Sequence, residues 1–364
     1  MKRYAAFLGT LAALGGYASL KAAAAFPACA LPAAAAGLVP PALAVWWQVS
    51  YRNGTLDEDS LGARALAWVA AAGLGVWATF LLLSAAGDAV SLLPRVELPG
   101  AAVAAAAGLI ATAGLAQALA GPRARELEVP IEGLPAGLDG LRIVHLSDLH
   151  IGPTIRRKEV AAVVERALAL KPDLIAVTGD LVDGAPARLA RQVAPLAALR
   201  APLGVYFVTG NHEYYWDAPA WLAQVRELGL TPLVNEGVVL SREGDRFLVA
   251  GVPDESGGHF VEGHFPHHRA AAIGPADFKI LLAHRPDGVP AAERAGFRLQ
   301  LSGHTHGGQF FPASLFIGLF HRFTRGLARH GRMWVHVSPG TGYWGPPHRF
   351  GVPAEITALT LRRG

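Results

Sequence analysis

Cysteine is almost absent from this chain. Its single cysteine, Cys29, lies inside an apolar run. One cysteine can form neither a disulfide framework nor a thiolate metal site, so both are excluded within a single chain. Cysteine usage therefore indicates no redox compartment. No internal repeat is visible either, and 364 residues are too many for one ordinary core, so we expect two or more parts.

Charge is also scarce. Charged residues make up 16% of the chain and hydrophobic residues 52%, and the mean hydropathy of +0.32 is high for a wholly soluble protein. The apolar excess lies upstream of about residue 121. The net charge of +4 would permit an acidic partner. However, several basic residues flank the apolar segments, where a membrane explains them better than nucleic acid does. We therefore expect no nucleic-acid partner.

Four apolar segments precede the change in composition, at residues 4–20, 22–49, 65–86 and 100–120. A spanning helix needs about 20 apolar residues, and the third and fourth segments supply them without an internal charge. The first segment is short. The second contains four prolines, which kink or break a helix unless its neighbours satisfy the backbone; they are Pro27, Pro32, Pro40 and Pro41. The pattern predicts a transmembrane helical region at residues 1–121 with about four helices.

Basic residues near the ends of these segments predict the orientation. If all four segments span, one side holds Lys2, Arg3, Arg52, Arg64, Arg123 and Arg125. Lys21 and Arg95 fall on the other side. The positive-inside rule then places both termini in the cytoplasm and makes this a multi-pass protein of the cell membrane. A secretory signal within residues 1–30 is one alternative, and it explains only the first segment. A buried soluble bundle is another, because alanine-rich helices are weakly hydrophobic.

Between residues 121 and 140 the composition changes abruptly to Pro, Arg, Glu and Gly. We interpret residues 122–140 as a juxtamembrane linker that can include an edge strand at residues 127–131. Downstream, apolar runs predict strands at residues 141–146, 174–177 and 204–208, and helical spacing predicts helices at residues 158–170 and 188–199. This alternation is typical of βαβ units with a parallel sheet.

Later strands lack long helices between them. They are predicted at residues 247–252, 279–283, 298–301, 333–337 and 356–361. A second, mixed sheet is therefore expected, and residues 141–364 are predicted to form one α/β domain.

Five short polar motifs occur in this region, and they follow predicted strands. In chain order they are Asp148-Leu149-His150, Gly179-Asp180, Gly210-Asn211-His212-Glu213, His284 and Gly303-His304-Thr305-His306. Each motif alone is a weak or moderate signal. Because α/β sheets place ligands at the ends of strands, we expect all five to meet at one edge. Their oxygen and imidazole nitrogen atoms can then hold two metal ions, a pair that activates water against phosphorus.

This ordered set of motifs resembles the calcineurin-like metallophosphoesterase superfamily. The resemblance covers about residues 141–361. The runs that begin at His145 and at Gly340 are similar to a bacterial, membrane-anchored branch with N-terminal transmembrane helices. A relative of that branch is described as a UDP-diacylglucosamine-type pyrophosphate hydrolase. The resemblance implies a four-layer αββα sandwich metallophosphoesterase domain, preceded here by about four transmembrane α-helices.

The resemblance also implies two metal sites that share one carboxylate. The ligands of the first are Asp148, His150 and His306, and those of the second are Asn211, His284 and His304. Asp180 would bridge them, because a carboxylate offers two oxygens to dications about 3.5–4 Å apart. The cofactors would be two divalent metal ions. With nitrogen and oxygen ligands and no sulfur, Mn²⁺, Zn²⁺, Fe, Co²⁺ and Ni²⁺ all stay open.

The resemblance makes His212 the catalytic residue, which protonates the leaving oxygen or binds a phosphoryl oxygen. Asp183 matches the carboxylate that orients this histidine in related phosphatases, where it fixes the tautomer. The phosphoprotein phosphatases have an arginine after that aspartate, whereas this chain has Gly184, which argues against that activity. The expected mechanism is one in-line attack by a hydroxide that bridges the metals, without a covalent intermediate.

Several other polar residues have a structural and a functional interpretation. We expect Glu213 to be structural rather than a base, and His145 to be a buried, hydrogen-bonded histidine. A further histidine cluster consists of His259, His264, His267 and His268. It has the residue type for another metal, but its glycine-rich surroundings favour a solvent-exposed loop over the cleft.

Substrate-binding candidates follow the last two motifs. Gly307 can bring backbone close to a substrate. Tyr343 and Trp344 either wall the pocket or pack in the core, and both interpretations stay open. The run at residues 310–323 is rich in Phe, Leu and Ile. It is either a core loop or an interfacial flap that dips toward a bilayer.

Together these residues predict a membrane-anchored dinuclear metallophosphoesterase that hydrolyses a phosphodiester or pyrophosphate bond. Its nearness to a bilayer leaves open a lipid-linked substrate, such as a UDP-diacylglucosamine-type molecule, with membrane lipids as further partners. One alternative is a nucleotide phosphodiesterase or nuclease. Another is a non-catalytic metal-binding membrane sensor, against which the complete ligand set and His212 argue. No protein partner is predicted.

Overall fold

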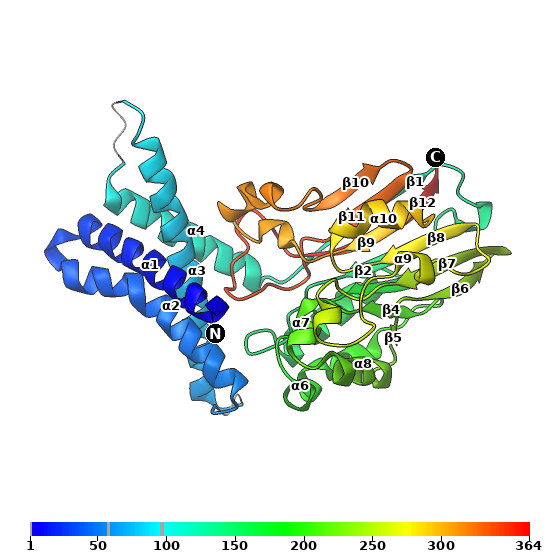
Figure 1. Ribbon diagram of the computed structural model, residues 1–364, viewed down its shortest axis with the longest axis horizontal. Coiled ribbons are helices and arrows are strands. Elements are labelled where there is room, and N and C mark those ends of the chain that lie inside the picture. Colours follow the sequence, from blue (N-terminus) through cyan, green and yellow to red (C-terminus); the bar gives the residue numbers. More distant parts are fainter. Residues whose placement is uncertain (1, 57–58, 95–97) are drawn as a thin grey trace. The chain divides into compact units, whose positions relative to one another are not determined.

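The computed structural model describes residues 2–56, 59–94 and 98–364 (Figure 1). Arg95, which contributed to the predicted orientation, lies outside the described residues. The chain divides into two compact units. The first comprises Met1–Ala120 with Phe310–Ser314 and Gly345–Gly351, and the second comprises Gly121–Gln309, Leu315–Trp344 and Val352–Gly364.

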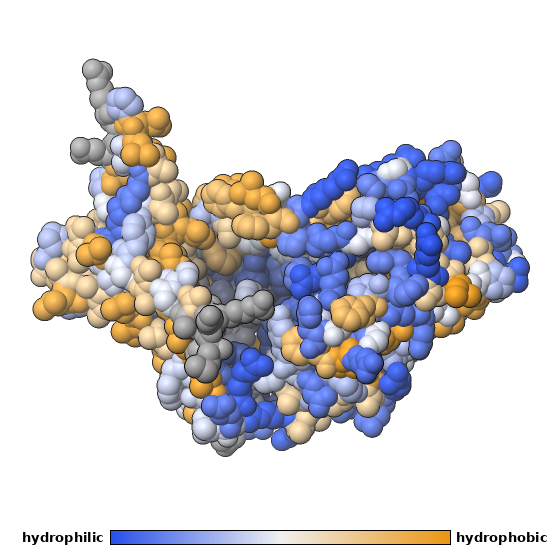
Figure 2. All heavy atoms as spheres, in the orientation of Figure 1, coloured by the Kyte–Doolittle hydropathy of each residue, from blue (hydrophilic) through white to orange (hydrophobic). Residues whose placement is uncertain are grey.

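Four helices dominate the first unit: α1 (Lys2–Ala25), α2 (Ala30–Arg52), α3 (Leu61–Val90) and α4 (Gly100–Leu119). Within the described residues, three stretches are long and apolar enough to cross a membrane, namely Pro27–Arg52, Leu61–Val90 and Gly100–Leu119. Figure 2 shows apolar side chains over much of their visible surface. The structure therefore supports about three apolar helices, and α1 is not among the three that qualify.

The prolines of the second segment do not all break the helix. Pro40 and Pro41 lie inside α2, which continues through them. The chain leaves the α-helix only at the 3-10 turn Pro27–Cys29, between α1 and α2. A proline ring costs one intrahelical hydrogen bond, which packing against neighbouring helices can offset.

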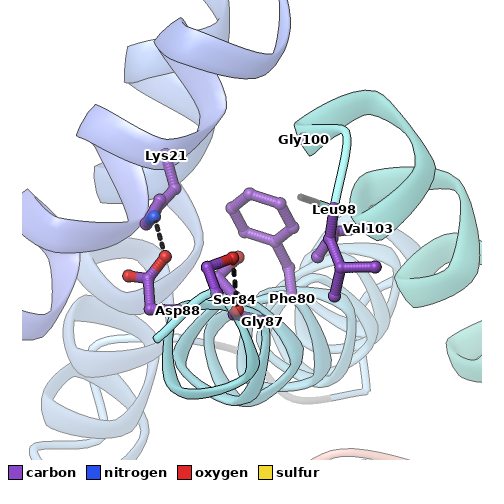
Figure 3. Close-up of a pocket in the computed structure, with 9 residues that line it drawn as sticks. Lys21, Phe80, Ser84, Gly87, Asp88, Leu98, Gly100 and Val103 are labelled. Atoms are coloured by element: carbon purple, nitrogen blue, oxygen red, sulfur yellow. Dashed lines mark hydrogen bonds and ion pairs between the residues drawn. The ribbon is translucent and has the colours of Figure 1, made fainter. Parts of the chain in front are cut away.

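Close approach and polar pairing hold α1, α2 and α3 together. A Cβ atom on Gly37 of α2 would lie 2.3 Å from the backbone nitrogen of Ser19 in α1, so only glycine fits there. Trp77 of α3 donates a hydrogen bond to the Gly37 carbonyl at 2.8 Å. Lys21 near the end of α1 pairs with Asp88 near the end of α3 (Figure 3).

Two short segments of the C-terminal half complete the first unit. His348 lies against α3 and α4, with its Nε2 3.0 Å from the Thr79 hydroxyl and its ring stacked on Phe310. Gly114 of α4 leaves the space for this ring, since a Cβ there would lie 1.7 Å from Nδ1. The sequence did not predict that these loops belong with the helices.

The second unit contains two six-stranded sheets. The first has the order β1-β12-β2-β3-β4-β5, with β1 (Arg123–Ile131), β2 (Arg142–Leu146), β3 (Leu174–Thr178), β4 (Val205–Val208), β5 (Thr231–Pro232) and β12 (Glu355–Arg363). The second has the order β10-β11-β9-β8-β7-β6, with β6 (Glu236–Arg242), β7 (Asp245–Gly251), β8 (Phe278–Leu282), β9 (Leu299–Ser302), β10 (Gly326–His330) and β11 (Met333–Val337).

Both sheets are mixed. In the first, β2 to β5 run parallel while β12 is antiparallel to β2. In the second, β7, β8, β9 and β11 run parallel, and β6 and β10 are antiparallel at the two edges. The edge strand predicted at residues 127–131 is confirmed, and β1 begins earlier, at Arg123. Part of the expected linker therefore belongs to the first sheet.

The two sheets share one apolar core, to which Ile143 and Leu174 of the first sheet and Phe247 and Leu299 of the second contribute. Longer helices of this unit are α5 (Arg157–Ala169), α6 (Pro186–Val193), α8 (Ala218–Glu227) and α10 (Val289–Arg294). Short helices α7 (Asn211–Tyr215) and α9 (His268–Ala271) follow β4 and precede β8. This core fixes the strands, and thereby the loops that leave their carboxyl ends.

Candidate metal centre

All five polar motifs leave the carboxyl end of a strand. Asp148 and His150 follow β2, Asp180 follows β3, and Asn211 follows β4. In the second sheet, one motif follows β8 and one follows β9; their candidate ligands are His284, His304 and His306. Because β2, β3 and β4 are parallel neighbours, as are β8 and β9, their ends meet at one edge of each sheet.

The first set of converging side chains is Asp148, His150 and His306. One ligand atom from each lies within 4.8 Å of the other two. Nε2 of His150 is 3.0 Å from Nε2 of His306, and the latter is 3.4 Å from Oδ1 of Asp148. All three side chains are buried.

The second set is Asp180, His284 and His304, whose ligand atoms also lie within 4.8 Å of one another. Nε2 of His284 is 3.2 Å from Nδ1 of His304 and 3.4 Å from Oδ2 of Asp180. His284 donates its Nδ1 proton to the Thr178 carbonyl at 2.7 Å. That bond fixes the tautomer and leaves Nε2 as the ligand atom.

Asp180 lies between the two sets. Its Oδ2 is 3.8 Å from Nε2 of His150 and 3.4 Å from Nε2 of His284. Its Oδ1 accepts a hydrogen bond from the backbone nitrogen of His212 at 2.9 Å. Oδ2 thus lies near imidazole nitrogens of both sets.

The donor atoms fit divalent ions. Two imidazole nitrogens that bind one ion at about 2.0–2.1 Å lie about 3 Å apart, which matches both the His150–His306 and the His284–His304 pairs. The buried Oδ1 of Asn211 has no hydrogen-bond partner among the described residues. A buried amide oxygen without a partner is costly unless it binds a ligand. The set contains no sulfur, so ligand type leaves the metal open.

The backbone at the centre is strained. Asp148, His150, Asp180, His304 and His306 all have positive φ angles, between 49° and 69°. Non-glycine residues in this region cost about 1–3 kcal/mol each, and such residues gather at functional sites. The turns after the strands therefore hold these side chains at the expense of backbone energy.

Two motif glycines allow the carboxylates to approach. A Cβ on Gly210 would lie 2.2 Å from Oδ1 of Asp180, and one on Gly303 would lie 2.1 Å from Oδ2 of Asp148. No side chain fits at either position without moving a candidate ligand. The spacing of the motifs thus reflects close packing as well as ligand chemistry.

His212 and Asp183 form a hydrogen-bonded pair beside the centre. His212 donates its Nδ1 proton to Oδ1 of Asp183, while Oδ2 of Asp183 lies 3.2 Å from Nδ1 of His150. Burial alone would lower the pKa of His212, but the carboxylates of Asp183 and Asp180 overcome burial and raise it to about 9. Burial opposes ionisation of Asp183, yet the neighbouring imidazoles hold the pKa of that carboxyl below its usual range.

Comparison with known proteins agrees with this geometry. The model of the calcineurin-like phosphoesterase family matches residues 141–308. An uncharacterized metallophosphoesterase of Aquifex aeolicus is 34% identical over 247 residues, which cover 66% of this chain and 92% of that protein. The chain belongs to the calcineurin-like metallophosphoesterase family.

Two animal relatives of this metallophosphoesterase carry the description "Transmembrane protein with metallophosphoesterase domain". The one from Bos taurus is 41% identical over 267 residues, or 70% of this chain and 60% of the relative. The one from Danio rerio is 36% identical over 268 residues, or 70% of this chain and 61% of the relative. The aligned region thus spans about three fifths of the length of these relatives.

Glu213 and His145 of this metallophosphoesterase are both buried and hydrogen-bonded, as expected for His145. Glu213 is buried and accepts hydrogen bonds from the backbone nitrogens of Asp180, Leu181 and Gly210 at 3.0, 2.7 and 2.6 Å. Burial and the charge of Asp180 raise its pKa to about 7. His145 is fully buried, with Nε2 2.7 Å from the Thr178 hydroxyl.

The further histidine cluster has other partners. Its members His259, His264, His267 and His268 belong to none of the candidate metal groups that the described residues form. Nδ1 of His264 lies 2.7 Å from the Tyr214 hydroxyl, and Nδ1 of His267 accepts a hydrogen bond from the first turn of α9.

The three substrate-binding candidates differ in exposure. Trp344 is 56% exposed, and its ring centroid lies 6.0 Å from that of His212. Tyr343 is buried, and burial raises the pKa of its hydroxyl to about 12. Gly307 is also buried, and a Cβ there would lie 3.1 Å from the Arg325 side chain. Of these three candidates, Trp344 is therefore the one that presents its side chain to solvent beside His212.

The side chains of three polar residues near the centre were given no role in the sequence analysis. Arg285 directly follows His284, and its Nε lies 2.8 Å from Oδ2 of the buried Asp254. Gln309 is buried and bonds to the backbone of Trp344. Asp254 follows the predicted strand at residues 247–252, so the strand-end rule alone points to it. No comparable signal exists for Gln309, whose partner is 35 residues away.

Proposed function

We propose that this protein is a membrane-anchored, dinuclear metal-dependent phosphoesterase that hydrolyses a phosphodiester or pyrophosphate bond. The observation that carries the proposal is the placement of Asp180, whose Oδ2 lies within 3.8 Å of imidazole nitrogens from both ligand sets. A mononuclear site needs no such arrangement. Family membership supports the same class of reaction.

Each ligand set holds one divalent ion in this proposal. The ligands of the first ion are Asp148, His150 and His306; those of the second are Asn211, His284 and His304; Asp180 is shared. When bound, such a pair polarises phosphoryl oxygens and lowers the pKa of water. The seven side chains approach from several strand ends, so the protein core fixes the position of the reacting phosphorus.

His212 supplies the proton for the leaving oxygen. Its Nδ1 proton is committed to Asp183, and its Nε2 lies 3.8 Å from Oδ2 of Asp180, on the side of the ligand sets. The neighbouring carboxylates favour the charged imidazolium, which has a proton to give at Nε2. General acid catalysis of this kind contributes about 10²–10⁴-fold. Trp344 and the backbone at Gly307 line the approach for the substrate.

Hydrolysis of bis-p-nitrophenyl phosphate by the full-length protein in detergent with Mn²⁺ tests this function. We expect kcat to fall by about 10²–10⁴-fold in His212→Ala, and to fall at least as far in Asp180→Asn. The matched control is His259→Ala, an exposed histidine outside both ligand sets, which should retain activity. A wild-type protein that binds Mn²⁺ and gives no turnover above His212→Ala and Asp180→Asn would contradict the proposal and favour a metal-binding sensor.

We further propose that the substrate is a lipid-linked phosphate or pyrophosphate, such as a UDP-diacylglucosamine-type molecule. Support comes from the short connection between the apolar helices and the first sheet of the catalytic unit, since three residues separate the end of α4 from the start of β1. Lipid-linked substrates in mixed micelles should then show a higher kcat/KM than the matching free nucleotides. The reverse order would favour a nucleotide phosphodiesterase.

We propose that α1 also crosses the membrane, which makes four spans ahead of a four-layer αββα unit. Lys21 lies in the last turns of α1 and Asp88 in the last turns of α3, and the two pair directly. The C-terminal turns of α1 and α3 therefore lie at the same depth, so these two helices run in the same direction. The helix α2, which lies between them in the sequence, then crosses in the opposite direction, as an arrangement of four spans requires.

The catalytic unit faces the cytoplasm of the cell in this proposal. Two spans, α3 and α4, separate Arg52 and Arg64 from Arg123 and Arg125, so these four arginines share one side whether or not α1 spans. The positive-inside rule favours the cytoplasm for that side. A protease added to intact cells should therefore leave this unit uncut, and should cut it only after lysis. Cleavage in intact cells would invert the topology.

A further inference from the structure

One surface of the second unit exposes an unusual group of large apolar side chains. Leu315, Phe316, Leu319 and Phe320 are 67%, 49%, 78% and 76% exposed, and we name these four residues the apolar tip. They lie on and beside two short 3-10 turns, Ala313–Leu315 and Ile317–Leu319. Figure 2 shows hydrophobic surface over this segment. Exposed apolar groups of this size in one place indicate a binding surface.

The residues that directly follow the apolar tip contact the candidate metal centre. Thr305 donates a hydrogen bond from its hydroxyl to the Thr324 carbonyl at 2.5 Å. The ring of His321 lies 5.6 Å from that of His304, and its Nδ1 lies 3.3 Å from Oδ2 of Asp287. The polar groups of His321 and Thr324 thus have partners within the protein, whereas the apolar tip has no comparable cover among the described residues.

The stretch of chain that contains the apolar tip has basic but no acidic residues. From residue 294 to residue 354 the chain has seven arginines and no aspartate or glutamate. Two of them, Arg322 and Arg325, are exposed and follow the tip directly. An apolar group flanked by arginine is the composition that binds the interfacial layer of an anionic bilayer, where the apolar side chains enter and the guanidinium groups meet phosphates.

A bilayer is within reach of this unit by chain length alone. The last candidate span ends at Leu119, and β1 begins at Arg123. At about 3.3–3.6 Å per residue, the intervening chain extends to about 14 Å at most. The start of β1 therefore lies within about 14 Å of the end of that span.

A second copy of the chain is a poorer match for the apolar tip. At about 150–250 Å² for a large buried side chain, four partly exposed ones offer roughly 400–600 Å². A stable protein–protein interface uses about 800 Å² on each partner. In a symmetric contact, the positively charged arginines of the two copies would also face and repel each other.

We infer that the apolar tip inserts into the interfacial layer of the bilayer that holds the chain's own helices, with Arg322 and Arg325 on anionic headgroups. This contact would place the centre that includes His304 at the membrane surface, where an amphipathic phosphate has its headgroup. The inference rests on the membrane anchoring in the proposed function but not on turnover, so a failure of hydrolysis leaves it standing.

The experiment measures the depth of single residues in proteoliposomes. Because Cys29 is the only cysteine, a Cys29→Ser background allows one nitroxide at a time, placed by Phe320→Cys or, as a control, by Ile273→Cys. Both native side chains are 76% exposed, so neither substitution disturbs the core. The full-length protein is reconstituted in vesicles of phosphatidylcholine, with or without phosphatidylglycerol. Collision with oxygen is then compared with collision with a water-soluble nickel chelate.

We expect the label at residue 320 to collide preferentially with oxygen and the label at residue 273 with the chelate. Anionic lipid should increase this preference at residue 320, and Arg322→Gln with Arg325→Gln should remove that increase. Equal collision at the two sites would overturn the inference. So would dipolar broadening at residue 320 that disappears on dilution with unlabelled protein, because this result identifies a second copy as the occupant.

Discussion

Gln309 and Trp344 exchange two hydrogen bonds. The Gln309 side chain donates from Nε2 to the Trp344 carbonyl at 2.8 Å, and its Oε1 accepts from the Trp344 backbone nitrogen at 2.8 Å. This pair ties the turn after the last ligand motif to the loop that carries the exposed indole beside His212. The position of Trp344 therefore depends on a buried side chain.

Replacement of Gln309 by alanine should weaken substrate binding more than it slows the reaction. Loss of both bonds leaves two backbone groups of Trp344 without partners, at about 1–2 kcal/mol, so we expect KM to rise by about 5–30-fold with a much smaller change in kcat. Steady-state kinetics on a diester substrate measures this split. Gln309→Glu, which keeps the acceptor and loses the donor, should give an intermediate KM. An equal fall in kcat and kcat/KM in Gln309→Ala would instead give the residue a role in the chemical step.

Asp183→Asn should slow catalysis while metal content is maintained. The amide oxygen can still accept the Nδ1 proton of His212, but the negative charge that favours the imidazolium is lost. We expect kcat to fall by about 10²-fold, at the lower end of the range for general acid catalysis. The assay uses saturating Mn²⁺, since Asp183 also lies 3.2 Å from Nδ1 of His150. Unchanged kcat at full metal occupancy would remove Asp183 from the mechanism.

Gly303→Ala should impair metal binding. The new Cβ would lie 2.1 Å from Oδ2 of Asp148, well inside van der Waals contact, so this carboxylate must move from its present position. Metal content after equilibration with Mn²⁺ measures the effect, and we expect at least one site to be lost. Gly108→Ala is the matched control, because nothing lies within 4 Å of the atom that it adds. Full occupancy in Gly303→Ala would show that Asp148 is not a ligand.

The strands and the ligand motifs could be predicted because their signals are local. An apolar run of about five residues followed by Asp, Asn or His marks a strand and its carboxyl end, and β2, β3, β4, β8 and β9 all lie where expected to within two residues. The strands β5, β6 and β10 were missed, because none has an apolar run of about five residues. In β6, for example, exposed and half-buried residues alternate.

Long-range packing could not be predicted. The fit of His348 beside Gly114 joins residues that are 234 positions apart, and neither residue has a distinctive neighbourhood in the sequence. The choice between core loop and interfacial flap for residues 310–323 was also left open, since both need the same apolar composition. Only the exposed fractions of the side chains distinguish them.

A buried histidine pair should make the fold sensitive to acid. His336 is fully buried, with Nδ1 2.9 Å from Nδ1 of His145. Burial, and then the charge of Arg125, lowers the pKa of His336 from 6.5 to about 3. The unfolded chain thus binds a proton that the folded chain rejects, so stability is complete above pH 6.5 and falls as the pH drops from 6.5 toward 3. The loss is at most about 1.4 kcal/mol per pH unit for this group.

Thermal unfolding of the full-length protein in detergent between pH 7 and pH 5 tests this expectation. His336→Asn lowers the stability at every pH but should lose less on acidification than the wild type. His259→Asn removes an exposed histidine and should retain the wild-type dependence. Parallel curves for the wild type and His336→Asn would show that His336 is not buried in its neutral form.

The most direct test of the central claim is the metal content of the purified full-length protein. The protein is equilibrated with excess Mn²⁺, free ions are removed, and bound manganese per chain is measured by elemental analysis. The converging donor sets around Asp180 predict two ions per chain in the wild type. His212→Ala should also bind two, and Asp180→Asn should bind fewer. One ion or none in the wild type, under saturating supply, would contradict a dinuclear centre.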